Sequence, residues 1–188
     1  KEISTQSIDQ IVNQVLEKIK NRLHKNTSPI KFLILAPVVH NRTGEFSSLF
    51  ANLRKQGYIR VRIDKQVYDL REELNLIKTN RHSVEAIIDR LVISKKQLQN
   101  AQEITTIKSR LTQSIEESLK LSDGLTIISF VLDDSFTFPD KPKKFEDYLL
   151  SEKLACSNCG ISIEELQPRM FSFNSPDGAC PNCNGLGS

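Results

Sequence analysis

The sequence has no tryptophan, only three tyrosines and a single methionine. It also has no run approaching the roughly 18 apolar residues that a membrane-spanning helix needs. The N-terminus lacks the basic, apolar and small-residue order of a signal peptide. These absences argue against a base-stacking platform for single-stranded nucleic acid and against a membrane protein. We therefore expect a cytoplasmic chain.

A nucleotide-hydrolysing site is missing as well. ATP hydrolysis on a phosphate-binding loop needs the pattern Gly-x-x-x-x-Gly-Lys-Ser/Thr, whose backbone amides and lysine neutralise the phosphates, and the sequence contains no such pattern. The three histidines, His24, His40 and His82, lie in unrelated polar loops or helix ends. We therefore expect no catalysis by this chain.

The length of 188 residues suits one domain and a smaller module. Hydrophobic residues make up 38% of the chain and charged residues 26%, which is ordinary for a folded globular protein. The first residue is lysine and the last residues read like a turn, so we expect a piece of a longer protein. The net charge of +3 hides an asymmetry, because residues 41–110 carry +6 and residues 111–188 carry −6. A basic middle segment suits either phosphate contacts or an acidic protein surface.

Hydrophobic periodicity predicts three helices and several short strands. Helices are expected over residues 7–23, 46–53 and 103–121, and strands over 32–36, 58–63, 66–70, 83–94 and 125–132, with a loop at 40–45 and a linker at 133–147. We expect an α+β fold. Residues 1–150 would form a small mixed sheet packed with helices, and residues 151–188 a zinc module with four cysteine ligands.

The strand expected at residues 58–63 alternates aliphatic with polar side chains. Its three aliphatic residues face one side, whereas Tyr58, Arg60 and Arg62 face the other. One side therefore belongs to the core and the other is charged. Taken alone, such a charged side is an ordinary solvated surface.

All four cysteines lie in the last 33 residues, as Cys156-x-x-Cys159 and Cys180-x-x-Cys183. Two such knuckles present four thiolates to one ion, which is typical of a structural zinc site. Two disulfides are disfavoured in a reducing cytosol, and a redox pair does not explain the second copy. Four protein ligands close the coordination sphere, so the predicted zinc ion is structural and stabilises a small segment.

Several longer motifs resemble one family. They are Leu35–Val39, Leu53–Asp64, Ile87–Arg90, Pro168–Pro176 and Gly178–Pro181. Together these segments closely resemble the UvrA family, the damage-recognising ATPases of bacterial nucleotide excision repair. The resemblance covers nearly the whole chain, and the motifs occur in the family's order.

The resemblance implies that residues 5 to about 150 form the inserted domain that binds UvrB, and that the cysteines form a zinc module joining it to the ATPase body. ATP binding, DNA contact and homodimer formation would then belong to the longer parent protein. Arg60 and Arg90 match the arginines of the family's binding patterns. Arg62, Lys55 and Arg81 are weaker candidates for the same UvrB interface, because they rest on proximity in sequence.

Two other functions stay open. The basic middle segment and the cysteine knuckles also suit a nucleic-acid-binding module that contacts duplex DNA, which would show a steep loss of affinity with salt. The segment Cys180–Gly187 resembles the cysteine and glycine element of DnaJ-type chaperones. That family repeats the element four times, and a single copy argues against this function.

Overall fold

A computed structural model describes residues 6–25, 28–74, 76–133, 137–155 and 162–163. The helices are α1 (Ile8–Lys25), α2 (Ser47–Lys55), α3 (Ala101–Leu121) and the short 3-10 helix η1 (Gln97–Gln99). The strands are β1 (Ile30–Thr43), β2 (Arg60–Ile63), β3 (Gln66–Asp69), β4 (Arg81–Ile93), β5 (Leu125–Val131), β6 (Phe145–Ser151), β7 (Leu154–Ala155) and β8 (Ser162–Ile163). Among these residues, no helix combines the length and the apolar character needed to cross a bilayer.

Six of the strands form one sheet in the order β3-β2-β4-β1-β5-β6, and β7 pairs with β8 in a separate ribbon. Every pairing in the large sheet is antiparallel. The α+β class predicted from the sequence is therefore confirmed. The expected mixture of strand directions is not found in the described sheet, because each of its strands runs opposite to its neighbours.

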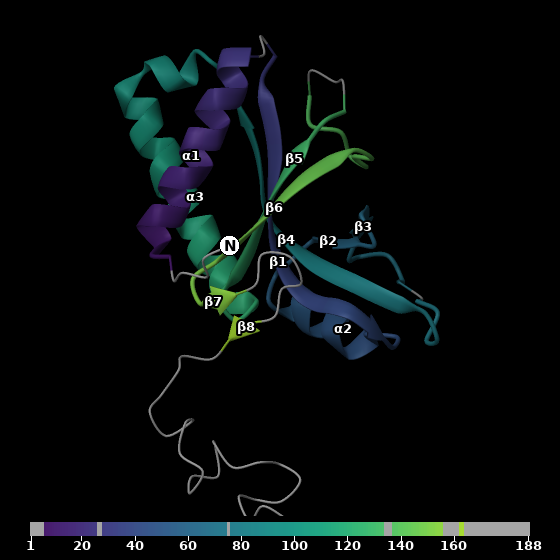
Figure 1. Cartoon of the computed structure of the whole chain (residues 1–188). Helices are drawn as coiled ribbons and strands as arrows, with labels where there is room; N and C mark the ends of the chain where they lie inside the picture. Colours follow the sequence, from purple (N-terminus) through teal and green to yellow (C-terminus); the bar gives the residue numbers. More distant parts are fainter. Residues whose placement is uncertain (1–5, 26–27, 75, 134–136, 156–161, 164–188) are drawn as a thin grey trace, which may run out of the picture.

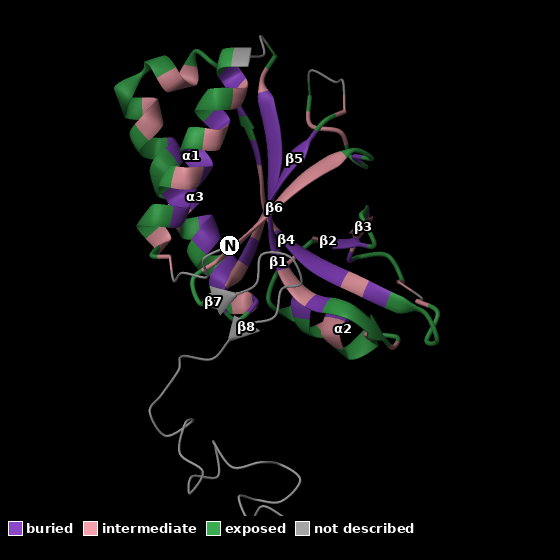
Figure 2. Ribbon diagram, viewed as in Figure 1, coloured by how far each residue is buried: buried purple, intermediate pink, exposed green. Residues whose placement is uncertain are grey.

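The three α-helices lie against one face of this sheet, with α1 beside α3 at one end and α2 at the other (Figure 1). Successive strand residues point to opposite faces, so Phe32 and Ile34 of β1 pack beneath α1 and α3. At the other end, Phe50 and Leu53 of α2 are buried against β2 and β4. Figure 2 shows that the buried residues of α1 and α3 lie toward the sheet and their exposed residues away from it. The opposite face, which no α-helix of the described residues covers, is the helix-free face of the sheet.

Helix α1 follows the apolar stripe predicted over residues 7–23. Its residues Ile11, Val15 and Ile19 are completely buried. Each such aliphatic side chain contributes about 1.5–3 kcal/mol through the water it excludes. The stripe therefore fixes which side of α1 contacts the sheet.

The end of α2 directs the chain into the strand that carries Arg60. Gly57 has a φ of +91°, a left-handed conformation that glycine adopts without a Cβ penalty. Its N–H donates to the carbonyl of Arg54, and the N–H of Tyr58 donates to the carbonyl of Leu53, each at 3.0 Å. This pair of bonds is the Schellman motif, and it reverses the chain between α2 and β2.

A tight hairpin joins β2 to β3, as the sequence predicted. Asp64 and Lys65 both have positive φ angles, of 48° and 68°. Two such residues form the type I′ turn, whose twist matches that of antiparallel strands. The short β2 strand is thus fixed at both ends.

Two segments of the sheet differ from the predictions made from the sequence. Strand β1 continues to Thr43 through the expected loop at 40–45, because register shifts after Pro37 and Val39 let it follow β4 around a bend. Strand β6 begins at Phe145, inside the expected linker at 133–147. Its acidic residues are held by arginines from distant elements, and no local sequence pattern reports such contacts.

Candidate functional site

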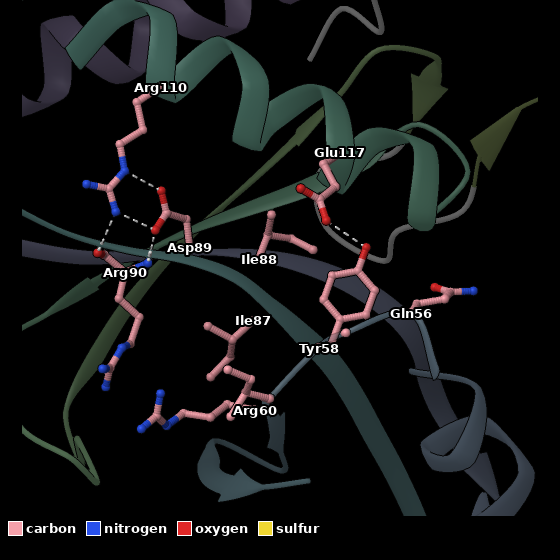
Figure 3. Close-up of a pocket in the computed structure, with 11 residues that line it drawn as sticks. Gln56, Tyr58, Arg60, Ile87, Ile88, Asp89, Arg90, Arg110 and Glu117 are labelled. Carbon is pink, nitrogen blue, oxygen red and sulfur yellow. Dashed lines mark hydrogen bonds and ion pairs between the residues drawn. The ribbon is translucent and has the colours of Figure 1, made fainter. Parts of the chain in front are cut away.

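A hollow of about 430 Å³ opens where β2 turns away from β4. The pairing of β2 with β4 covers only Val84 to Ala86, while β4 continues to Ile93. The hollow is lined by residues 56–60 at the start of β2, by residues 87–90 of β4, and by Arg110 and Glu117 of α3 (Figure 3). Charged side chains from three elements therefore meet around one opening.

Arg60 is half-buried at the first position of β2 and faces the hollow (Figure 3). The residue opposite it on β3 is Asp69. That carboxylate is engaged by Arg71 at 2.9 and 2.6 Å, and these hydrogen bonds hold the pKa of Asp69 well below its usual range. Within the described residues, the Arg60 guanidinium donates no hydrogen bond to a carboxylate, although its positive charge helps to lower the pKa of Asp69.

Arg90 lies on the helix-free face of β4, opposite Leu33 of β1. Its guanidinium carbon lies 5.2 Å from the ring centroid of Phe138, a cation–π contact that holds the side chain in place. Partial burial lowers the pKa of Arg90, the nearby positive charge of Arg60 lowers it further, and the negative charge of Asp140 partly opposes this shift. In the described part of the chain, neither guanidinium forms an ion pair. The two like charges share the hollow, an arrangement that favours binding of an anion.

Two polar contacts fix the far wall of the hollow to α3. Arg110 donates to both carboxylate oxygens of Asp89 at 2.8 Å, and these bonds raise the pKa of Arg110. The Tyr58 hydroxyl donates to Glu117 at 2.9 Å. Burial of the phenol, together with that hydrogen bond, raises the pKa of Tyr58 to about 12. The wall is therefore held by contacts between β4, α3 and the start of β2.

Arg62 has a different role, because it is completely buried on the helix-free face. Its guanidinium donates two hydrogen bonds to Glu85 at 3.2 Å, two to Asp147 at 2.9 and 3.0 Å, and one to Ser129 at 3.0 Å. All five N–H donors of the group are therefore satisfied. Lys65 also pairs with Asp147. We call these residues the Arg62 cluster.

This burial corrects the sequence prediction for Arg62. Alternation placed it correctly on the face opposite Val61, but the side chain is not exposed there and is not available to a partner. The reason lies in the curl of the sheet. A flat sheet would separate β2 from β6 by roughly 19 Å, yet Arg62 reaches Asp147 directly. Burial of Asp147 opposes its ionisation, but the hydrogen bonds from Arg62, Lys65 and Ser129 outweigh this and lower the pKa to about 2.

The two remaining candidates, Lys55 and Arg81, lie outside the hollow. Lys55 is exposed at the end of α2. Arg81 is exposed at the start of β4 and donates to the backbone carbonyl of Asn41 at 3.0 Å. Neither lines the hollow with Arg60 and Arg90. The fold thus brings together two of the five arginines and lysines selected from the sequence.

The residues of α3 that complete the hollow were not predicted from the sequence. Arg110 and Glu117 are seven residues apart, which places them on the same side of a helix. That spacing was readable, but it does not tell which strand the side of the helix would face. Asp89 was visible only as part of a motif. Its pairing with Arg110 depends on the tertiary packing of α3 against β4.

The four cysteines Cys156, Cys159, Cys180 and Cys183 lie outside the described residues, so the zinc site and the module boundary at residue 150 stay predictions. Among the residues that the structure does describe, no group of three or more histidine, cysteine, aspartate or glutamate side chains could hold a metal ion.

Comparison with known proteins agrees with the motifs. A family described as the UvrA interaction domain matches residues 6–131. The chain is 42% identical over 189 residues to UvrABC system protein A of Clostridium perfringens, 39% over 188 residues to that of Listeria monocytogenes serovar 1/2a, and 38% over 189 residues to that of Methanothermobacter thermautotrophicus. Each alignment covers 100% of this chain but only 16–17% of the relative, so the chain spans about one sixth of the length of these relatives. The matched region covers most of the chain and includes strands β1 to β5, the three α-helices and the residues that line the hollow, so the chain belongs to the UvrA interaction domain family.

Proposed function

We propose that this chain is a protein-interaction module that binds UvrB during nucleotide excision repair, and that Arg60 and Arg90 form the centre of its binding surface. The observation that carries this proposal is the pair of guanidinium groups at one hollow, neither of which forms an ion pair in the described part of the chain. Membership of the UvrA interaction domain family supports UvrB as the partner.

The chemistry of the hollow fits acidic side chains on that partner. A guanidinium forms two parallel hydrogen bonds with one carboxylate, which fixes orientation as well as adding affinity. Arg90 is partly desolvated and held against Phe138, so little side-chain freedom is lost when it binds. A carboxylate placed here also relieves the repulsion between Arg60 and Arg90. Charge pairs of this kind are worth about 2–5 kcal/mol when one partner is removed.

The test is isothermal titration of purified UvrB into the chain and its variants. Arg60→Glu and Arg90→Glu should each weaken binding by about 2–5 kcal/mol, which is thirtyfold or more. Lys55→Glu and Arg81→Glu are matched controls, because they reverse an exposed charge outside the hollow. Normal binding by both hollow variants, or equal loss in all four, would contradict the assignment of the site.

Binding to duplex DNA is the second candidate, and it rests on the net charge of +6 in residues 41–110. The fold reduces the support for it, because Arg62, Arg71 and Arg110 of that segment are already in ion pairs. Titration with duplex DNA at two salt concentrations separates the functions. DNA binding that falls steeply with salt, together with no affinity for UvrB, would favour this alternative.

We further propose one structural zinc ion bound by the four cysteines, since four thiolates are a soft donor set that suits zinc. Elemental analysis of the purified chain should find one zinc per molecule, and replacing either cysteine pair by serine should abolish it. The parent protein's ATP binding, DNA contact and homodimer would reside in parts outside this chain, which itself performs no catalysis.

A further inference from the structure

One edge of β4 lacks a neighbouring strand over half its length. Residues 89–93 pair with β1 in a continuous register, whereas the pairing with β2 ends at Ala86. Within the described residues, β4 therefore has a strand on one side only beyond that point. Unpaired edges expose N–H and C=O groups that can pair with another chain.

The hollow lies at this edge and not on a face of the sheet. Asp89 and Arg90 are adjacent in β4, so their side chains point to opposite faces. Asp89 contacts α3 on the helix-covered face, and Arg90 lies with Leu33 on the helix-free face. Both residues line the same hollow. Side chains from both faces of a sheet can line the same opening only if that opening lies at the edge of the strand.

The backbone groups at this edge are directed into the opening. The N–H of Arg90 donates to the side chain of Asp89 at 2.7 Å, and Arg110 approaches the carbonyl of Arg90 at 3.5 Å. Both groups therefore point away from β1. Groups two residues apart point the same way in an antiparallel pair, so the N–H of Val92 points outward as well. The side chain of Val92 is 41% exposed.

From this arrangement we infer that UvrB binds by adding an extended, acidic segment to the free edge of β4. The inference rests on the proposed function and describes how the same site recognises its partner. Arg90 and Val92 lie on the same side of β4, and Arg60 faces the same hollow. The incoming strand therefore carries an aspartate or glutamate facing the two arginines and an apolar residue two positions away, facing Val92.

The contacts of the unbound chain are consistent with such an exchange. Asp89 and Arg110 occupy the backbone groups of Arg90 in the way that charged side chains protect an edge strand from aggregation. These are side-chain contacts at a solvent-accessible opening, so an incoming backbone replaces them without disturbing the pairing of β4 with β1. Affinity then comes from main-chain hydrogen bonds, and specificity from the arginines.

The test uses Val92→Pro, with Val92→Ala as its control, in the whole chain. Proline at residue 92 removes the backbone N–H donor that points outward from the edge of β4, and leaves the pairing with β1 intact. Titration with UvrB should show affinity reduced at least about tenfold for Val92→Pro and by no more than about twofold for Val92→Ala, with both circular dichroism spectra unchanged. Wild-type affinity in a folded Val92→Pro chain would overturn strand addition and leave the proposed function standing.

A second measurement covers the case in which Val92→Pro does not fold. Amide hydrogen exchange of the wild-type chain, with and without UvrB, reports on the N–H of Val92 directly. Slower exchange of this amide in the complex is expected, and unchanged exchange would overturn strand addition. Absence of any UvrB binding by the wild-type chain would instead remove the proposed function, and this inference with it.

Discussion

Replacing Arg62 by methionine tests how the Arg62 cluster stabilises the fold. The variant keeps an apolar stem of similar length but leaves the carboxylates of Glu85 and Asp147 without their buried cation. Their side chains are only 9% and 19% exposed. Removing one partner of a buried ion pair costs about 3–5 kcal/mol, because the other charge stays desolvated. For a chain of this size, we expect the melting temperature to fall by roughly 10 °C.

The assay is urea unfolding followed by circular dichroism, on wild type, Arg62→Met and Lys65→Met. Lys65 binds the same carboxylate of Asp147, but its side chain is 62% exposed, so its loss should cost less than about 1 kcal/mol. The difference in free energy of unfolding between wild type and Arg62→Met should narrow as the pH falls from 7 toward 4, because protonation of Asp147 removes a charge that the variant leaves buried without Arg62. A loss below about 1 kcal/mol for Arg62→Met, or equal losses in both variants, would refute the reasoning.

Three further predictions concern pH and backbone conformation. The pKa of Asp147 is lowered to about 2, so its contribution to stability is present above about pH 4 and is lost as the pH falls toward 2. The free energy of unfolding of wild type should therefore fall over that pH range, and Asp147→Asn should lack this part of the pH dependence. The hydrogen bond to Asp64, 2.6 Å long, raises the pKa of His82 above 6.5, so the stability it adds is complete below that pH and is lost as the pH rises through the folded-state value. Unfolding measured from pH 6 to 9 should show this decline in wild type but not in His82→Gln, and a decline in both would contradict it. Gly57→Ala should lower the free energy of unfolding in urea by about 1 kcal/mol, because alanine disfavours the φ of +91° at the end of α2. An unchanged urea midpoint would show that the turn relaxes.

The elements predicted correctly from the sequence are those whose signal is local. The stripe of α1, the glycine after α2 and the turn at Asp64 and Lys65 each report their own conformation through residue type and spacing. Strand β6 could not be found in this way. Its residues Glu146 and Asp147 read as solvated, and their partners Arg22 and Arg62 come from elements more than 80 residues away.

The same division holds for the candidate site. Alternation identified the side of β2 on which Arg60 and Arg62 lie, but it could not show that the sheet curls until Arg62 meets β6. Arg60 and Arg90 were brought together by a family resemblance and not by any spacing rule. Their common hollow depends on β2 being too short to cover β4, and that length is set by the turn after Gly57.

Under the proposed function, the helix-free face has two separate tasks, which are to stabilise the fold and to bind a partner. The Arg62 cluster holds distant strands together through buried hydrogen bonds and ion pairs. Arg60 and Arg90, which line the hollow, take no part in that network. Evolution can therefore retune these two arginines toward a different partner without endangering the integrity of the scaffold. Protein engineering could do the same, by substituting residues at the edge of β4 and leaving the Arg62 cluster unchanged.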